Sequence, residues 1–408
     1  MRLWILTQFY PPEVGAAAVR LSRLARLLAK DGHDVTVITG MPNYPDGVIP
    51  PPYRGKLGHR ETIAGVNVRR VWVFASPSKR ARSRLINQFS FMIMTALRGT
   101  WLRRPDAILV ESHPLFVTMS AGWLRRVKRA PALLNVSDLW PESAVATGML
   151  KAESFLVKMA SWIERWAYND AAHIVGMTQG VVDGILRVHP KANRVSLITN
   201  AVDLEAFAPV SESARAEAKT SLGLRADQTV AVHIGNMSLT YDFGPILDAA
   251  AALPDLAIVF AGSGSQAATI ESQVKSRGLS NIRLLGLLPH NDMPRIWAAS
   301  DICLISLANH SVADGTRPAK MYEAFATGTP VVAAIRGEGE ALLKEANAGI
   351  VVGVGDSAGY IAALRDLKDN PARRQAISAA AREYAEATLS PQAVKDAYLA
   401  ILQEVRQK

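Results

Sequence analysis

The sequence predicts an α/β protein built from two doubly wound domains, each a parallel sheet covered by helices. Short β-branched runs alternate with helical patterns along the chain, and these runs fall into two series separated by a polar joint. A chain of 408 residues with 49% hydrophobic content is also too long for one compact core. We therefore expect a first domain at 1–199, with the helix at 390–408 packing back on it, and a second domain at 200–389. Two facing domains of this kind would enclose a cleft at the carboxyl ends of their strands.

The first series opens with a strand at 2–7, an amphipathic helix at 16–30 and a strand at 34–39, with Gly32 as the helix stop signal. This βαβ unit predicts parallel strand pairing. The proline-rich stretch MPNYPDGVIPPPYRGK reads as a loop. Further strands are expected at 66–73, 107–111, 132–136, 174–177 and 195–198.

The second series begins near Thr229, after the joint TNAVDLEAFAP and a charged helix at 211–223. Its expected strands are the runs VAVHIG, LAIVFAG, IRLLG, ICLIS, PVVAA and IVVG, each followed by a helical pattern. The domain boundary therefore lies at about 199–209.

Composition narrows the class of protein. The single cysteine, Cys303, excludes a disulfide scaffold and indicates a reducing compartment. The apolar run LWILTQFYPP is too short for a signal peptide and reads as the first strand, so a cytoplasmic location is expected.

The positive charge is concentrated in the first domain. Residues 1–199 hold 27 Lys and Arg against 13 Asp and Glu, and 11 of these basic residues lie between Lys79 and Arg129. Such a field suits phosphorylated substrates or an anionic membrane surface. Nucleic acid is disfavoured as a partner, because the sequence contains no recognised binding module.

An apolar stretch, Leu85–Leu102, lies between two of the basic clusters. Asn87, Gln88 and Arg98 interrupt it, which argues against a transmembrane span. Two interpretations stay open. It is either a buried helix of the first domain or a helix in the membrane interface, anchored by Trp101 and the flanking basic residues.

Two glycine loops follow expected strands. In FYPPEVGAAAVR, Gly15 would let backbone approach a phosphate at a helix N-terminus, although the pattern by itself favours a plain strand-to-helix turn. In AGSGS, Gly262 and Gly264 form a G-x-G turn of a kind common in α/β folds.

The stretch ADGTRPAKMYEAFATGTPVV, residues 313–332, places Lys320 three positions before Glu323 on an otherwise apolar helix. Together with PPEVG, SDLWPESAVATGML, TNAVDLEAFAP, AGSG and LPHNDMPRIWAASDICLIS, it resembles the retaining glycosyltransferases of the GT4 family, which have the GT-B fold. The similarity extends over essentially the whole chain. The segment DLWPES suggests the branch that builds bacterial surface polysaccharides and O-antigens, often on a polyprenyl-diphosphate carrier.

The resemblance implies a role for each residue of the late helix. Glu323 would hold the ribose hydroxyls of a nucleotide sugar, and Lys320, on the same helix face, would reach the diphosphate as it leaves. The alternative is an exposed ion pair at i, i+3. The other donor contacts that the resemblance implies are Gly15, Gly235, Asn236, Gly262, Gly264, Leu287, Asp314, Gly315, Thr316 and Arg317.

The chain departs from the family pattern at two places. The position eight residues before Glu323, usually a glutamate that contacts the sugar, is Gly315, so Asp314, Thr316 and Arg317 are the candidates to replace it. The loop GNMSLTYDFG lacks the usual basic residues, so Arg317 and Lys320 must supply the positive charge.

Candidates for the acceptor side follow strands of the first domain. The resemblance assigns His113 a hydrogen bond to the reacting sugar, although a buried core histidine is an alternative. Asp138 could receive the acceptor hydroxyl or its proton, or could instead cap the following helix. Glu111 is a third, weaker candidate.

The resemblance implies a retaining, metal-independent hexosyl or N-acetylhexosaminyl transfer from a UDP-sugar to a hydroxyl of a lipid-linked or glycan acceptor. No cofactor is expected, and the enzyme would work at the inner face of an anionic cytoplasmic membrane. A UDP-sugar epimerase of the same fold and a catalytically silent scaffold are the alternatives.

Overall fold

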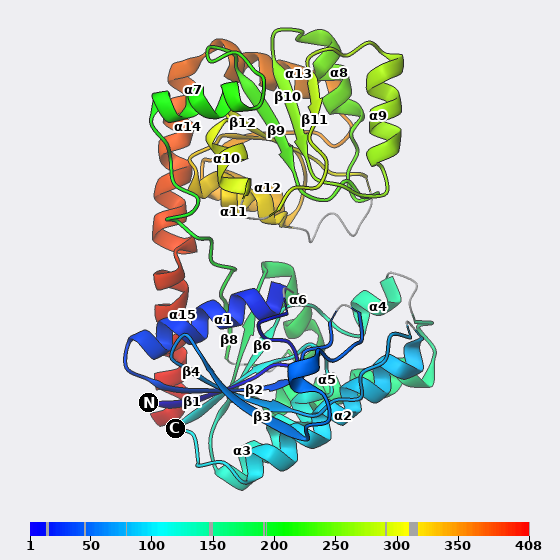
Figure 1. The fold of residues 1–408 in the computed structure, drawn as a ribbon, viewed down its shortest axis with the longest axis vertical. Helices are drawn as coiled ribbons and strands as arrows, with labels where there is room; N and C mark the ends of the chain where they lie inside the picture. The colour runs from blue at the N-terminus through cyan, green and yellow to red at the C-terminus, as the bar shows by residue number, and fades with distance from the viewer. Residues whose placement is uncertain are drawn as a thin grey trace. The chain divides into compact units, whose positions relative to one another are not determined.

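The computed structural model describes residues 1–13, 16–44, 46–78, 80–146, 150–190, 192, 194–289, 292–309 and 317–407. The chain divides into two compact units, shown in Figure 1. Unit 1 comprises Met1–Asn200 and Pro391–Lys408, and unit 2 comprises Ala201–Ser390. These limits lie within one residue of the domain boundaries expected from the sequence.

In its described residues, unit 1 contains an eight-stranded sheet with the order β3-β4-β2-β1-β5-β6-β7-β8. All neighbouring strands are parallel except β3, which is antiparallel to β4. The strands are β1 Arg2–Leu6, β2 Asp34–Gly40, β3 Gly58–Ile63, β4 Val66–Val71, β5 Ala107–Glu111, β6 Ala132–Val136, β7 His173–Gly176 and β8 Val195–Leu197. The helices are α1 Ala16–Lys30, η1 Pro51–Tyr53, α2 Ala81–Thr100, α3 Val117–Lys128, α4 Glu142–Ala146, α5 Phe155–Asp170, α6 Gln179–Val188 and α15 Pro391–Gln407.

The described part of unit 2 contains a six-stranded parallel sheet with the order β11-β10-β9-β12-β13-β14. Its strands are β9 Val230–Ile234, β10 Ala257–Ala261, β11 Ile282–Leu284, β12 Ile302–Ser306, β13 Val331–Ala334 and β14 Gly349–Val352. Its helices are α7 Glu212–Ser221, α8 Gly244–Ala252, α9 Ala267–Ser276, α10 Met293–Ala298, α11 Ala319–Ala326, α12 Glu338–Glu345, α13 Ser357–Asp369, α14 Pro371–Tyr384 and the π-helical turn η4 Ala385–Leu389.

The apolar runs form central strands because both faces of the sheet are covered by helices. On β10, Val259 packs into one core, and Ile258 and Phe260 pack into the core on the opposite face. This arrangement follows from the two-residue period of a strand. The two α/β units confirm the predicted fold class.

Two local expectations were incomplete. Strand β3, Gly58–Ile63, was not predicted, because GHRETI is polar and its side chains alternate between exposed and half-buried at the edge of the sheet. The stretch 85–102 lies mainly in helix α2, which has one buried side and one side that exposes apolar residues. Phe91 on α2 is buried, whereas Ile93 and Leu97 are 51% and 55% exposed.

The C-terminal helix α15 belongs to unit 1. Tyr398, Leu402 and Val405 are buried there, and α15 packs on α1. The Tyr398 hydroxyl donates a hydrogen bond to Oδ1 of Asn135 on β6. The chain therefore closes its first unit with its last helix.

Candidate functional site

The carboxyl ends of β9 and β10 in unit 2 carry two loops that contain four of the predicted donor contacts. Gly235 and Asn236 follow β9, and Gly262 and Gly264 follow β10. The Gly235 amide donates to the carbonyl oxygen of Ala261 at 2.8 Å. The two loops therefore lie directly against each other.

Glycine is required at this contact for steric reasons. A Cβ on Gly262 would lie 1.8 Å from the carbonyl oxygen of Gly235, and one on Gly264 would lie 2.5 Å from that of Met237. Gly235 and Gly262 also have positive φ angles, 109° and 154°, which non-glycine residues rarely adopt. The G-x-G pattern thus has a structural cause, and its contact with a donor stays a prediction.

Lys320, in the first turn of α11, is the only one of the predicted charged residues on this helix that is buried, with 6% exposure. Its Nζ lies 3.0 Å from Nε2 and 3.3 Å from Nδ1 of His233, and 4.3 Å from the ring centroid of Tyr241. Burial lowers the pKa of Lys320 from 10.5 to about 7. The alternative interpretation of an exposed ion pair with Glu323 is therefore wrong.

His233 is a functional candidate that the sequence interpretation missed. It is fully buried near the end of β9, with Tyr241 and Phe243 edge-on to its ring. Its Nδ1 lies 3.2 Å from the carbonyl oxygen of Leu304, which can only accept, so we assign the ring proton to Nδ1. The Nε2 lone pair is then available to accept a hydrogen bond from the Lys320 ammonium group. Burial and the nearby Lys320 hold the pKa of His233 well below its usual value, which keeps the ring neutral.

Glu323 lies one turn after Lys320 on α11 and is half-buried. Its Oε2 accepts a hydrogen bond from Nε1 of Trp297 on α10, at 2.8 Å. This bond holds the carboxylate in one orientation. The sequence offered a weak signal for Trp297, which lies in the quoted segment LPHNDMPRIWAASDICLIS without an assigned role.

Arg317 is less available as a donor contact than the sequence suggested. Its Nε forms an ion pair with Oε2 of Glu338, at 2.8 Å, and both side chains are largely buried. Leu287, after β11, is 80% exposed. The predicted contacts Gly15, Asp314, Gly315 and Thr316 lie outside the described residues.

On unit 1, the predicted acceptor residues follow the neighbouring strands β5 and β6. His113 and Asp138 are both exposed at the carboxyl ends of these strands. The alternative of a buried core histidine is therefore wrong for His113. Helix α4 begins at Glu142, so Asp138 does not occupy the position immediately before it.

Glu111, by contrast, is fully buried at the end of β5 and serves as the centre of a polar network. Its carboxylate forms an ion pair with Arg20 and accepts hydrogen bonds from Asn135, at 2.7 Å, and Ser137. Asn135 in turn accepts from Tyr398. A carboxylate enclosed in this way positions the ends of β5 and β6, and it is a poor candidate for a proton acceptor from a substrate.

The loop PPEVG contains a further residue with a role that the sequence did not reveal. Glu13 is buried, and its carboxylate accepts hydrogen bonds from the backbone amides of Asn43 and Tyr44, both at 2.9 Å. The carboxylate thereby ties the loop after β1 to the loop after β2. Burial raises the pKa of Glu13.

Two family models match the chain, one in each half. "Glycosyl transferase 4-like domain" matches residues 15–201, and "Glycosyl transferases group 1" matches residues 214–384. The chain is 23% identical over 402 residues to the putative colanic acid biosynthesis glycosyl transferase WcaI of Escherichia coli (strain K12), covering 97% of this chain and 98% of the relative. It is 29% identical over 285 residues to a D-inositol 3-phosphate glycosyltransferase of Mycobacterium sp. (strain KMS), covering 67% of this chain and 62% of the relative.

Solved structures share the fold. The crystal structure of Anabaena HepE in complex with UDP has a TM-score of 0.72 at 17% identity, covering 99% of this chain and 100% of that chain. Sucrose-phosphate synthase from Thermosynechococcus elongatus has a TM-score of 0.70 at 18% identity, covering 99% and 98%.

Proposed function

This chain belongs to the GT4 family of group 1 glycosyltransferases with the GT-B fold, and we propose that it moves a hexosyl or N-acetylhexosaminyl group from a UDP-sugar to an acceptor hydroxyl with retention of anomeric configuration. The proposed acceptor is a polyprenyl-diphosphate-linked sugar in the synthesis of a bacterial surface polysaccharide. The similarity to the colanic acid transferase over almost the whole chain supports this choice of product.

The observation that carries the proposal is the buried ammonium group of Lys320. It forms no ion pair with a described carboxylate, and its nearest polar partner, His233, is neutral. The Glu323 carboxylate attracts this ammonium group only from beyond ion-pair distance. A buried cation with no carboxylate in direct contact is unfavourable, and a bound diphosphate would provide the missing negative charge. The Gly235 loop lies next to it, since a Cβ on Gly235 would come within 3.9 Å of Lys320 Cε.

The chemistry then follows from charge. As the bond between the anomeric carbon and the diphosphate oxygen breaks, the acceptor oxygen bonds to that carbon and gives up its proton, for which Asp138 is the proposed acceptor. Negative charge grows on the leaving diphosphate, and Lys320 stabilises it. Glu323, oriented by Trp297, would accept hydrogen bonds from the ribose hydroxyls. His113 and Asp138 are the proposed contacts for the reacting sugar and the acceptor hydroxyl.

A donor screen tests the proposal. Thermal unfolding is measured with UDP-glucose and a panel of other nucleotide sugars, because a ligand that binds the folded state raises its apparent stability. The proposed donor is then incubated with a lipid-linked acceptor, and the anomeric configuration of the product is read by NMR. A chain that binds none of the donors is a scaffold, and release of an epimerised sugar without an acceptor identifies an epimerase. Either result would overturn the proposal.

A further inference from the structure

Helix α2 carries a stripe of exposed apolar side chains along one face. Phe89, Ile93, Leu97 and Trp101, spaced four residues apart, are 36%, 51%, 55% and 84% exposed. Residues at this spacing lie on the same side of a helix. None of the described helices is both long and apolar enough to cross a bilayer. Phe89 also packs on the ring of Phe116, with 4.3 Å between the centroids, and the exposed parts of the four side chains form an apolar surface.

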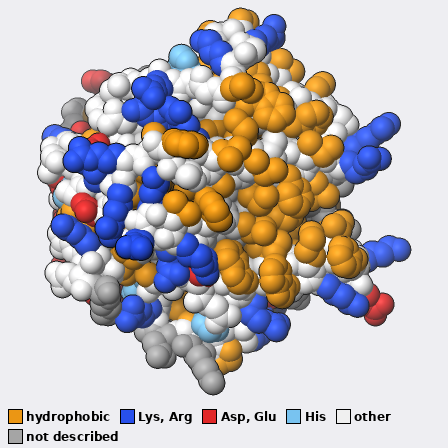
Figure 2. All heavy atoms as spheres, turned by 90° about the horizontal axis from the view of Figure 1, so that it is seen from below, with side chains coloured by type: hydrophobic (Ala, Val, Ile, Leu, Met, Phe, Trp, Pro, Cys, Tyr) orange, Lys and Arg blue, Asp and Glu red, His pale blue; other side chains and the backbone are white. Residues whose placement is uncertain are grey.

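Neighbouring helices extend this surface. Helix α3 packs between α2 and α5, and the Trp123 indole on α3 donates to Oγ1 of Thr100 at 3.0 Å. The exposed apolar residues of these two helices are Trp123, Val127, Phe155, Leu156 and Trp162. Figure 2 shows hydrophobic side chains gathered over one side of this face of unit 1. A contiguous patch of this kind marks an interaction site.

An apolar groove lies at the α2 part of the patch. It has a volume of about 640 Å³ and runs between α2 and the segment after β4. Its lining residues are Trp72, Phe74, Arg82, Leu85, Ile86, Phe89, Ser90, Ile93 and Met94. A groove of this size and composition suits a hydrocarbon chain.

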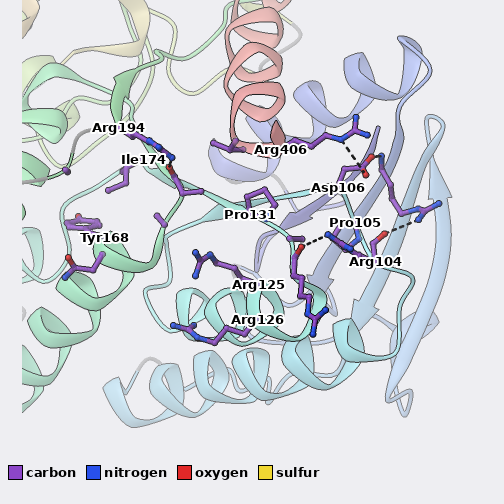
Figure 3. Close-up of a pocket in the computed structure, with 18 of the residues that line it drawn as sticks. Arg104, Pro105, Asp106, Arg125, Arg126, Pro131, Tyr168, Ile174, Arg194 and Arg406 are labelled. Atoms are coloured by element: carbon purple, nitrogen blue, oxygen red, sulfur yellow. Dashed lines mark hydrogen bonds and ion pairs between the residues drawn. The ribbon is translucent and has the colours of Figure 1, made fainter. Parts of the chain in front are cut away.

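A second hollow, of about 1270 Å³, lies at the amino ends of β5, β6 and β7 and is lined by arginines (Figure 3). This edge of the sheet is opposite to the one that carries His113 and Asp138. The arginines are Arg2, Arg103, Arg104, Arg125, Arg126, Arg129, Arg194 and Arg406. We call this hollow the arginine pocket.

The arginine pocket has an excess of positive charge. Arg125 and Arg126 share the carboxylate of Asp170, Arg2 pairs with Asp34, and Arg406 lies 3.9 Å from Asp106. Among the described residues, no carboxylate forms an ion pair with the other four arginines. Guanidinium groups bind phosphate oxygens in a bidentate manner, so the pocket suits phosphate groups.

The apolar patch and the arginine pocket share helix α3. Its exposed Trp123 and Val127 contribute to the patch, and Arg125 and Arg126 contribute to the pocket. Figure 2 shows basic side chains gathered beside the hydrophobic ones on this face.

We infer that these two regions form one docking surface for an anionic lipid bilayer, with the apolar side chains of α2, α3 and α5 entering the interface and lipid phosphates entering the arginine pocket. Tryptophan suits the membrane–water boundary, and basic residues bind the anionic surface beside it. Face-to-face pairing of two copies would instead bring an excess of positive charge against itself. The inference rests on the proposed function in one respect, because a lipid-linked acceptor would be presented at such a surface.

Vesicle sedimentation with the full chain tests the inference. Vesicles of phosphatidylcholine alone are compared with vesicles of phosphatidylcholine and phosphatidylglycerol, and we expect binding only to the mixture. Combining Arg103→Gln, Arg129→Gln and Arg194→Gln should weaken partitioning about a hundredfold, since each basic residue near an anionic surface contributes roughly a factor of five. These three arginines form no described ion pair, and the hydrogen bond that Arg194 donates to the Ala172 carbonyl is long, 3.5 Å, and exposed, so the fold should depend little on them.

A matched control removes the same charge from unit 2. Arg283, Arg295 and Arg365 are exposed there, and their combined change to glutamine should leave vesicle binding unaltered. A second variant, with Ile93→Ser, Leu97→Ser and Trp101→Ser, should lose binding while it keeps the thermal unfolding temperature of the parent.

Three results would overturn the inference. They are absence of binding to the anionic vesicles, equal loss in the two arginine variants, or a lipid-free dimer in analytical ultracentrifugation that the α2 variant dissociates. Calorimetry with UDP-glucose separates this inference from the transfer reaction. If the docking variants lose vesicle binding but still bind the nucleotide sugar, the proposed function stands. If the parent chain binds vesicles but no donor, the proposed function fails and the docking inference stands.

Discussion

The Nζ atom of Lys320 lies 3.0 Å from Nε2 of His233, and both side chains are buried at the carboxyl edge of the unit 2 sheet. The pair joins a helix, α11, to a strand, β9, through one hydrogen bond between a lysine and a neutral ring. Because the pair lies next to the Gly235 loop, we expect changes in its charge or hydrogen bonding to alter donor affinity.

Donor affinity should depend on pH through Lys320. Burial lowers the pKa of Lys320 to about 7, although the nearby Glu323 carboxylate favours the charged form. The other titratable groups around it, His233, Cys303 and Tyr241, have pKa values that keep them neutral there. A diphosphate binds the protonated form, so calorimetry with UDP-glucose should show affinity falling about tenfold per pH unit as the pH rises above 7. In Lys320→Met this dependence should disappear, and a slope that persists would contradict the assignment.

The same lowered pKa of Lys320 predicts that the free energy of unfolding rises with pH, whereas donor affinity falls. Because the folded pKa of Lys320 is lower than the unfolded value, the unfolded chain binds more protons between about pH 7 and 10.5. The cost of burying the charge is therefore fully present below pH 7 and is relieved as the pH rises toward 10.5. Urea unfolding should find Lys320→Met more stable than the parent below pH 7, with the difference fading at alkaline pH.

Replacing His233 by phenylalanine tests the assigned hydrogen bond. His233→Phe keeps an aromatic ring among Tyr241 and Phe243 but removes the Nε2 acceptor. We expect UDP affinity to fall by about tenfold, because a hydrogen bond to a charged group is worth roughly 1.5 kcal/mol or more. His233→Asn, which retains an acceptor, should recover part of the loss. Equal affinity in all three proteins would mean that the ring only fills space.

Trp297 and Glu323 should act as a unit in nucleotide binding. Glu323→Ala should weaken UDP binding strongly, whereas Trp297→Phe, which removes only the indole donor and some volume, should weaken it about tenfold. In a double-mutant cycle by calorimetry the two losses should not add, because Trp297 acts through the carboxylate that the other variant lacks. Additive losses would show that Trp297 acts independently of Glu323.

Gly262 should be intolerant of any side chain. Gly262→Ala places a Cβ against the Gly235 carbonyl at 1.8 Å, so we expect a loss of about 3 kcal/mol in the free energy of unfolding. Gly278 is the matched control, since it also has a positive φ angle, 63°, but its Cβ position is open. Gly278→Ala should cost about 1 kcal/mol in the same urea titration. Similar costs at the two sites would show that the two loops can move apart and accommodate the added Cβ.

Removal of the Tyr398 hydroxyl should loosen α15. Tyr398→Phe deletes the hydrogen bond to Asn135 in a buried network, with an expected cost of about 1 to 3 kcal/mol in thermal or urea unfolding. Tyr384→Phe removes a bond to Glu345 that lies near the surface of unit 2 and should change stability little. Amide hydrogen exchange should localise the first effect to α15 and β6, and an equal change in both variants would contradict this prediction.

Periodicity revealed most of the fold, because central parallel strands and their covering helices have strong apolar patterns. It failed at β3, where an edge strand with polar residues on both faces resembles a loop. It also could not decide the surroundings of α2, since a helix that is apolar on two faces has the same sequence whether its outer face is covered or exposed.

The candidate site was harder to predict than the fold. The spacing of Lys320 and Glu323 indicated a shared helix face, but only the packing of β9 against α11 shows that Lys320 meets His233 instead of a carboxylate. His233 lies in an apolar run, where a histidine gives little signal. The roles of Glu13 and Glu111 depend on partners 30 and 24 residues away, which a local motif does not reveal.

The return of α15 to unit 1 has a consequence for how the protein is made. The ribosome completes residues 1–200 before it reaches Tyr398 and Leu402. During synthesis, the apolar surface of unit 1 that α15 covers therefore stays exposed until all of unit 2 has emerged. A shortened chain that stops at residue 390 would keep that surface exposed permanently and would be a natural client for chaperones.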